Sequence, residues 1–388
     1  MGLPRPLTVV LHAPAMSNSQ EGILVRVPSV LIYFGITYGI VLALILVPFV
    51  QTHLVYGHHR GFSSIPNFSS LEDYGLAPGK TVNLYIKSAD NTTLGAWFVM
   101  SEKYYHSLSF PVKAIDIPAA LKKRPTILFL HGKTGHRAVP LRVPIYAAFS
   151  SRLDANVFAV DYRGFGDSEG QPTLAGVAAD ARAAWDYLTT LGAEPKDVLI
   201  VGHSLGTCVA GLLAAELSQE GISPRGLVLL APFASVKTLM YEYYLFGFLP
   251  LLKPLVRVPT VSRFVTGLLT HRFDTLNLVP KIAGSVLIAH AEDDRAVPHA
   301  HADTLFNAFI DPLLPATPIQ FDGKDLAAQQ ADMRKELVTV LKIPAFGKLE
   351  ETQRGGHRFA LLKTAKGTHD IGRVEGVQDV IGRMFGFL

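Results

Sequence analysis

The sequence predicts an α/β fold whose sheet is mostly parallel, doubly wound and covered by helices on both faces. Three observations predict it. Short, fully apolar runs recur along the chain, as strands buried on both faces require. Segments with helical character separate these runs. One run, residues 198–202, ends in G-x-S-x-G at 202–206 and passes directly into helical sequence rich in Ala and Leu.

The G-x-S-x-G motif predicts a nucleophile elbow, in which a strand, a sharp turn and a helix place Ser204 at the apex. Gly202 and Gly206 suit this turn because the strand and the helix approach too closely for a Cβ. The motif alone is weak, since residue usage gives roughly one chance match per ten chains of this length. Its position between a strand and a helix makes it informative.

The remaining elements follow the same alternation. Residues 81–86 and 94–100 alternate polar with apolar residues and flank Asp90-Asn91, which predicts a β-hairpin. We expect the other elements in this order: strand 126–130, strand 157–161, helix 174–191, the elbow strand and its helix, strand 227–232, strand 285–290, strand 359–363 and helix 374–385. Active sites in such sheets lie at the carboxyl ends of the strands.

Two insertions interrupt the alternation. Residues 233–282 are rich in aromatic residues and Leu, especially at 240–252, and lie between two late strands. They predict either ordinary packing helices or an apolar cap that admits a lipid chain and touches the bilayer. Residues 311–356, with three early prolines and a charged middle, suggest a surface insertion without an assigned role.

Residues 30–50 predict a single transmembrane helix between an N-terminal tail (1–29) and a linker (51–79), which leads to the catalytic domain (80–388). The run contains no charge, and about 20 helical residues at 1.5 Å each cross a hydrocarbon core of roughly 30 Å. A signal peptide would have a shorter apolar core followed by a cleavage site. A buried hairpin is a further alternative, but no α/β core needs such a run before its first strand.

Composition limits the partners. Of 388 residues, 49% are hydrophobic and 18% charged, which is ample material for a large core. The net charge of +4 is spread along the chain, so no nucleic-acid binding is expected. Cys208 is the only cysteine, which excludes an intramolecular disulfide, and we expect a packed core thiol. His58 and His59 lack the spacing of a metal site, so no metal is expected.

A serine nucleophile needs a base to take its proton and an acid to orient the base. The loop after strand 285–290 offers three adjacent carboxylates, and the pattern D-x-x-V-P favours Asp294 as the acid, with Asp293 in reserve. His369 lies between the last strand and the closing helix, where the base of this arrangement belongs. His357 is the second candidate for the base.

The oxyanion that develops during acyl transfer needs two backbone N–H groups. Leu205, which follows the nucleophile, is expected to supply one, and Lys133, in the loop after strand 126–130, the other. The second assignment rests on geometry typical of the fold. A further polar set is expected to hold the turn after strand 157–161 without touching substrate: Asp161, Arg163, Asp167 and Ser168.

Five motifs together resemble the α/β-hydrolase superfamily: residues 131–135, 161–168, 202–207, 290–298 and 369–372. The chain is most similar to its membrane-anchored lysophospholipid and monoacylglycerol lipases. That resemblance implies an α/β-hydrolase fold and an endoplasmic-reticulum protein with a lumenal domain, which cleaves lysophosphatidylserine or monoacylglycerol without a cofactor. It maps the nucleophile to Ser204, the acid to Asp294 and the base to His369. Sequons at Asn67 and Asn91 slightly favour the lumenal side and glycosylation.

The sequence therefore predicts a membrane-anchored serine hydrolase that cleaves the ester of a monoacyl lipid, with the lipid and the bilayer as its partners. A serine peptidase or small-ester carboxylesterase on the same fold is the nearest alternative. A non-catalytic membrane adaptor is the alternative of another class, although a scaffold has no use for a complete set of Ser, Asp and His. The oligomeric state, the head group and the acyl chain stay open.

Overall fold

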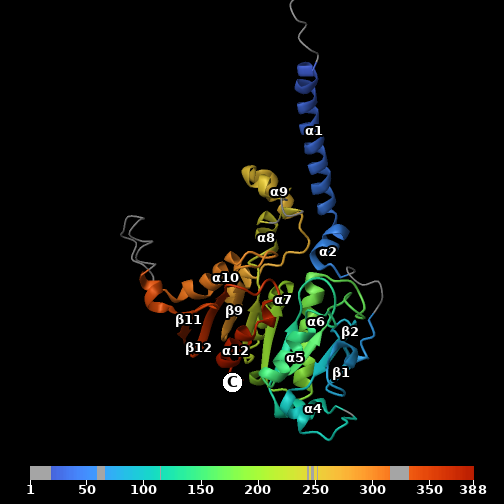
Figure 1. Cartoon of the computed structure of the whole chain (residues 1–388), viewed down its shortest axis with the longest axis vertical. Helices are drawn as coiled ribbons and strands as arrows, with labels where there is room; N and C mark the ends of the chain where they lie inside the picture. Colours follow the sequence, from blue (N-terminus) through green and yellow to red (C-terminus); the bar gives the residue numbers. More distant parts are fainter. Residues whose placement is uncertain are drawn as a thin grey trace, which may run out of the picture. The chain divides into compact units, whose positions relative to one another are not determined.

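The computed structural model (Figure 1) describes residues 19–58, 66–113, 115–242, 244–245, 249–250, 252–314 and 332–388; for 19–31, 244–245 and 249–250 it describes the backbone only. The chain divides into two compact units, residues 1–50 and residues 51–388. The second unit contains the sheet and every candidate site residue.

Helix α1 (Ser19–Leu46) of the first unit ends before Pro48, where α2 (Pro48–Tyr56) begins and continues into the second unit. Proline lacks a backbone N–H and is favoured at the first position of a helix, so the helix restarts there. The predicted unbroken span over residues 30–50 is therefore wrong at its C-terminal end. Within the described residues no single helix is long and apolar enough to cross a bilayer; Ile32–Leu46 and Pro48–Tyr56, bent by 82°, qualify only as a pair.

The main sheet has ten described strands in the order β1-β2-β4-β3-β5-β6-β9-β12-β11-β10. The strands from β4 to β12 in this order run parallel, and antiparallel pairs flank them on both sides. Their bounds are β1 Thr81–Lys87, β2 Thr93–Val99, β3 Thr126–Leu130, β4 Asn156–Val160, β5 Val198–His203, β6 Gly226–Leu230, β9 Val286–Ala291, β10 Thr339–Ile343, β11 Gly347–Arg354 and β12 His357–Thr364.

Helices cover both faces of this sheet (Figure 1). Alternate residues of each central strand enter two hydrophobic clusters, because successive side chains point to opposite faces. One cluster packs against α6 (Leu174–Thr190), α7 (Leu205–Gln219) and α10 (Ala300–Ile310). The other packs against α5 (Val143–Arg152) and α12 (Glu375–Met384). The predicted doubly wound sheet is confirmed. Shorter helices α3 (Glu102–His106) and α4 (Ile117–Lys123) precede β3.

Two segments differ from the sequence-based expectation. Residues 339–354, expected within a surface insertion, form β10 and β11, which pair with each other and with β12 and so extend the main sheet. Residues 51–58 and 66–79, expected to be a linker, belong to the compact second unit. Tyr56 there is fully buried, so the folded unit begins well before residue 80.

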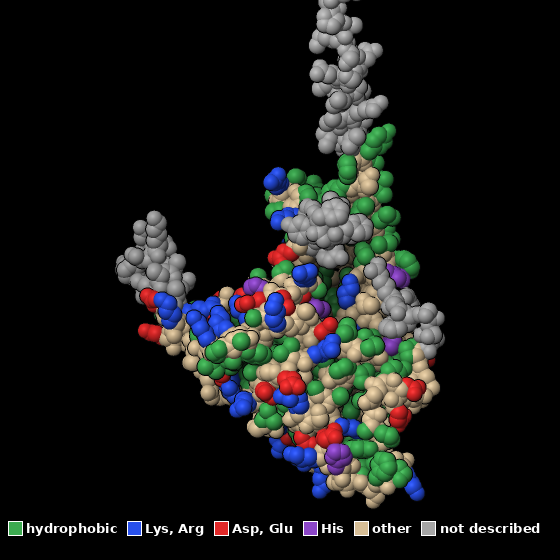
Figure 2. Space-filling view, in the orientation of Figure 1, with side chains coloured by type: hydrophobic (Ala, Val, Ile, Leu, Met, Phe, Trp, Pro, Cys, Tyr) green, Lys and Arg blue, Asp and Glu red, His purple; other side chains and the backbone are tan. Residues whose placement is uncertain are grey.

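The insertion between β6 and β9 contains α8 (Val236–Glu242), the hairpin of β7 (Tyr244–Leu245) and β8 (Leu249–Pro250), and α9 (Pro259–Gly267); 3₁₀ helices η3 (Lys253–Arg257) and η4 (Leu276–Lys281) complete it. Most side chains of the aromatic stretch 240–252 lie outside the described residues. Around α9 several apolar side chains are exposed, including Val256 at 56% and Phe264 at 67%. Hydrophobic side chains and Lys or Arg lie side by side over α9 (Figure 2). Helix α9 therefore buries Val265 and leaves other apolar side chains exposed.

Candidate active site

Ser204 lies at the sharp turn between β5 and α7, with φ of 52° and ψ of −119°. A positive φ is strained for a residue with a Cβ, so the surrounding packing must hold it. A Cβ added to Gly206 would lie 2.0 Å from the carbonyl oxygen of Leu130, and one added to Gly202 would lie 2.4 Å from that of Gly206. Only glycine fits at these two positions. The predicted strand, turn and helix are confirmed.

Three side chains form a hydrogen-bonded chain at the carboxyl ends of β5, β9 and β12. Ser204 Oγ lies 2.8 Å from His369 Nε2, and His369 Nδ1 lies 2.8 Å from Asp294 Oδ2. They come from positions up to 165 residues apart. The structure thus brings together the three residues expected to be nucleophile, base and acid; their catalytic roles stay predictions. The His369 side chain is 27% exposed, so water can approach it.

Asp294 is held as a carboxylate. Its Oδ1 accepts hydrogen bonds from the N–H groups of Ala296 and Val297 at 2.8 and 3.0 Å. Burial opposes ionisation, but hydrogen bonds from His290 and His369 outweigh it and lower the pKa of Asp294 from its ordinary value. An ionised acid in this position can orient the His369 ring and stabilise a protonated form of it.

Asp293, the reserve acid, has a different position. Its Oδ1 accepts a hydrogen bond of 2.8 Å from the N–H of Thr368, the residue directly before His369. Sequence reasoning missed a second contact: the Nε2 of His203 lies 2.9 Å from the carbonyl oxygen of His369. Burial above all lowers the pKa of His203 to about 3, so this ring is neutral and donates its proton to that oxygen. Both contacts fix the backbone that carries His369.

Replacing Asp293 by Ala is expected to lower kcat by about tenfold, because one hydrogen bond that holds the His369 loop is lost. Glu292→Ala, at the exposed neighbouring carboxylate, is the matched control and should keep full activity. Steady-state ester hydrolysis measures both. Equal activity of the two variants would contradict a positioning role for Asp293.

His357, the second candidate for the base, begins β12, where it pairs with Arg354 of β11. The carboxyl end of β12 leads to His369, so His357 lies at the opposite, amino end of the strand and cannot reach Ser204.

The expected polar turn after β4 is confirmed: Asp161 accepts from Arg137, Ser168 Oγ donates to the Asp161 carbonyl, and Arg163 pairs with Asp180. Arg137, fully buried, was missed because its partners are distant in sequence. Cys208 is a buried core thiol, as expected.

The expected oxyanion donors lie on the two sides of the nucleophile. Leu205 is the first residue of α7, whose N-terminal N–H groups have no partner within the helix. A Cβ added to Gly132 would lie 3.0 Å from the Cβ of Ser204, so the loop that carries Lys133 passes directly beside the serine. The assignment of the Leu205 and Lys133 N–H groups to an oxyanion stays a prediction.

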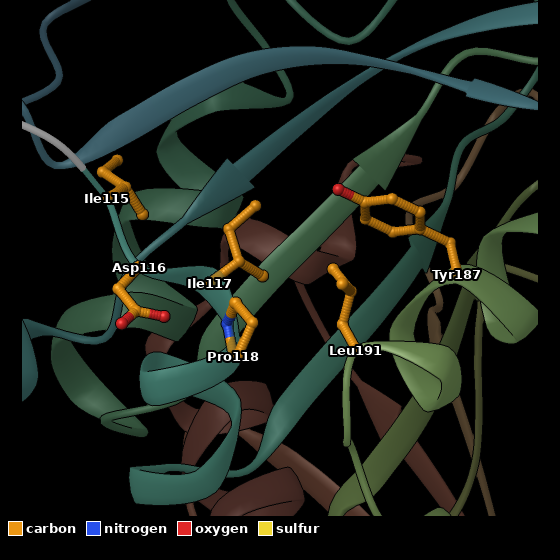
Figure 3. A pocket seen from close by; sticks show the side chains of 6 residues that line it. All are labelled: Ile115, Asp116, Ile117, Pro118, Tyr187 and Leu191. Atoms are coloured by element: carbon orange, nitrogen blue, oxygen red, sulfur yellow. The ribbon is translucent and has the colours of Figure 1, made fainter.

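A surface pocket lies elsewhere. Figure 3 shows it between α4 and the end of α6, lined by Ile115, Asp116, Ile117, Pro118, Tyr187 and Leu191. Helix α4 leads into the amino end of β3, and a strand of five residues spans roughly 17 Å, so the pocket is remote from Ser204. Within the described residues no group of three or more His, Cys, Asp or Glu side chains could hold a metal ion.

The chain belongs to the alpha/beta hydrolase family, whose family model matches residues 127–366. The fold agrees: a crystal structure of an alpha-beta hydrolase from Vibrio vulnificus superposes with a TM-score of 0.54 at 18% identity, covering 87% of this chain and 93% of that one.

Within this family the chain is similar to the lysophosphatidylserine lipase ABHD12 of several vertebrates. The identity to the Danio rerio protein is 30% over 304 residues, which cover 74% of each chain. The identity to the Bos taurus protein is 29% over 303 residues, which cover 74% of this chain and 71% of that one.

Proposed function

We propose that the protein is a membrane-anchored serine hydrolase that cleaves the carboxylic ester of a monoacyl lipid, a lysophospholipid or a monoacylglycerol, without a cofactor. The hydrogen-bonded chain from Ser204 through His369 to the ionised Asp294 carries the chemical part of this proposal. The similarity to proteins named lysophosphatidylserine lipase supports the substrate class.

The proposed reaction uses this hydrogen-bonded chain. His369 Nε2 takes the proton of Ser204 Oγ, which attacks the acyl carbon, and the carbonyl electrons move onto oxygen. The N–H groups of Leu205 and Lys133 bind this oxyanion. The tetrahedral intermediate collapses when His369 gives its proton to the leaving glycerol oxygen, which leaves an acyl ester on Ser204. Water, deprotonated by the same histidine, then releases the fatty acid by the reverse sequence.

The segment around α9 supports a lipid substrate. Residues 252–273 contain Lys253, Arg257, Arg263 and Arg272 and no acidic residue. Apolar side chains that include Val261 and Phe264 are exposed in the same segment. A surface that combines exposed apolar groups with positive charge suits the interface of a bilayer that contains anionic lipids. This cap would meet a single-chain lipid where it partitions, in the membrane.

Phe264→Asp tests this role of the cap. It should lower hydrolysis of a long-chain lysophospholipid in anionic vesicles by about tenfold, because a charge opposes insertion into the bilayer, and leave hydrolysis of p-nitrophenyl butyrate unchanged. Val340→Asp places the same charge on the exposed strand β10 and is the matched control. Equal loss on both substrates would instead indicate damage to the fold.

The acyl-chain profile separates the proposal from its alternatives. A lipase prefers long acyl chains, whereas a small-ester hydrolase prefers short ones and a peptidase cleaves amides. An adaptor, although folded, would fail to label with a fluorophosphonate.

The anchor and the compartment form part of the proposal. The apolar residues before Pro48 provide the anchor. Asn67 and Asn91 are both exposed, so a lumenal domain in the endoplasmic reticulum would carry sugars there. Glycosidase treatment of the protein from cells should increase its mobility if the domain is lumenal, and Asn67→Gln with Asn91→Gln should abolish that change.

A further inference from the structure

The loop between β3 and α5, which we call the oxyanion loop (residues 132–136), turns around a buried guanidinium. Arg142 is 7% exposed, and all its hydrogen-bond acceptors among the described residues are backbone carbonyls. Its Nη1 lies 2.8 Å from the carbonyl oxygen of His136. Its Nη2 lies 3.0, 3.3 and 2.6 Å from those of Gly132, Lys133 and Thr134. Buried arginines ordinarily pair with carboxylates, so this use of a cation is unusual.

These contacts determine where the N–H groups of the oxyanion loop point. In a trans peptide unit the C=O and the following N–H point in opposite directions. Because Arg142 holds the Gly132 carbonyl, together with the His131 Nδ1 at 2.7 Å, the N–H of Lys133 is directed away from the guanidinium. The Lys133 carbonyl is held in the same way, and the N–H of Thr134 accordingly points outward, where it donates to the Tyr56 carbonyl at 2.8 Å.

Residues 51–57, which we call the N-terminal arm, hold the outer side of the oxyanion loop. Besides the bond from Thr134 to Tyr56, Lys133 Nζ lies 3.1 Å from the Leu54 carbonyl oxygen. A Cβ added to Gly57 would lie 2.5 Å from Thr134 Oγ1, so the arm and the oxyanion loop are in close contact. Thr134 and Gly135 have positive φ values of 67° and 76°. A loop in this conformation needs support from its surroundings.

We propose that Arg142 and the N-terminal arm clamp the oxyanion loop from its two sides, so that Arg142 is a positioning residue for the Lys133 N–H. The inference deepens the proposed function and rests on it, because it takes this N–H as an oxyanion donor. The clamp acts on the transition state rather than on the bound ester, since the oxyanion forms only during reaction.

Arg142→Lys and Arg142→Met in the full chain test the inner side of the clamp. A lysine keeps the charge but cannot reach four carbonyls with the geometry of the guanidinium. We expect kcat to fall about 10- to 100-fold in both, with KM changed less than about threefold. Affinity for a long-chain trifluoromethyl ketone, whose adduct with Ser204 carries the same oxyanion, should fall in parallel. Affinity for a non-hydrolysable lysophospholipid ether should not change.

Arg163→Met is the control for Arg142. Arg163 lies in the neighbouring turn after β4, and its loss removes contacts to Asp180 of α6 and to Asp90 but none in the oxyanion loop. It should lower thermal stability while leaving kcat of the folded protein unchanged. Wild-type kcat in a folded Arg142 variant, or equal weakening of the ketone and the ether, would overturn the inference.

Gly57→Ala tests the outer side and stays informative if the Arg142 variants fail to fold. Its new Cβ meets Thr134, whereas Gly75→Ala introduces a Cβ at a similar positive φ with nothing within 4 Å. We expect kcat to fall about 5- to 20-fold in Gly57→Ala only. Equal effects of the two variants would overturn the outer half of the clamp.

The choice of substrate separates a failure of the proposed function from a failure of the clamp. All variants are assayed with p-nitrophenyl butyrate as well as with a lysophospholipid. Wild-type protein that hydrolyses only the short ester contradicts the lipid substrate but still tests the clamp. Wild-type protein that hydrolyses neither ester contradicts the proposed function itself.

Discussion

Ser204→Ala is expected to abolish ester hydrolysis, with a loss of kcat of about 10⁵-fold or more, because no acyl-enzyme can form. Labelling by a fluorophosphonate probe should disappear with it. Folding should be retained, since the lost hydroxyl contacts only the His369 ring among the described side chains. Both assays use the full chain purified in detergent, and thermal unfolding confirms that the variant is folded.

Ser218→Ala, at the other end of the same helix α7, is the matched control. Its hydroxyl donates to the Ala214 carbonyl and has no contact with the site. It should label and hydrolyse as the wild type does. A Ser204→Ala protein that keeps its esterase activity and its labelling would contradict the assignment of the nucleophile and favour another serine.

Asp294→Asn is expected to lower kcat by about 10⁴-fold while leaving the geometry nearly unchanged. An amide donates where the carboxylate accepts, so it stabilises the wrong tautomer of His369 and cannot stabilise the imidazolium. Asp303→Asn removes another carboxylate after the same strand, one that pairs with Lys363, and is the control. Wild-type activity of Asp294→Asn would exclude Asp294 as the acid.

Asp294→Asn also tests how the free energy of unfolding depends on pH. The pKa of Asp294 is lower in the folded protein than its ordinary value of 3.8, so the ionised carboxylate stabilises the fold above that value. This contribution is lost as the pH falls from about 4 toward the folded pKa. Urea unfolding should show the free-energy difference between wild type and Asp294→Asn shrinking below pH 4. A difference that grows on acidification would contradict the lowered pKa.

Much of the fold was predictable because its central strands are buried on both faces and so consist of uninterrupted apolar residues. Strands β10 and β11 escaped prediction for the opposite reason. They lie at the edge of the sheet. Strand β11 (GKLEETQR) is mostly polar and charged and so resembles a loop, whereas β10 (TVLKI) has strand-forming residues but is short and follows a charged segment. The span over residues 30–50 was overextended because a count of apolar residues gives no weight to Pro48.

The same distinction applies to the site. Ser204, Asp294 and His369 could be proposed because each follows a recognisable strand and their order along the chain is fixed by the fold. The groups that support them carry no local signal. His203 reaches the carbonyl of a residue 166 positions away, and Arg142 binds carbonyls that every residue possesses. Only the folded chain shows such contacts.

The contacts of the N-terminal arm also limit how far the protein can be truncated from its N-terminus. Gln51 accepts hydrogen bonds from the N–H and hydroxyl of Thr270 and donates to the Leu268 carbonyl, at the base of the cap. A truncated protein that starts at residue 80 would leave these cap groups, together with the Thr134 N–H, without their partners, at a cost of about 1–3 kcal/mol for each one buried. A truncated catalytic unit intended for crystals or enzymology should therefore start no later than Gln51.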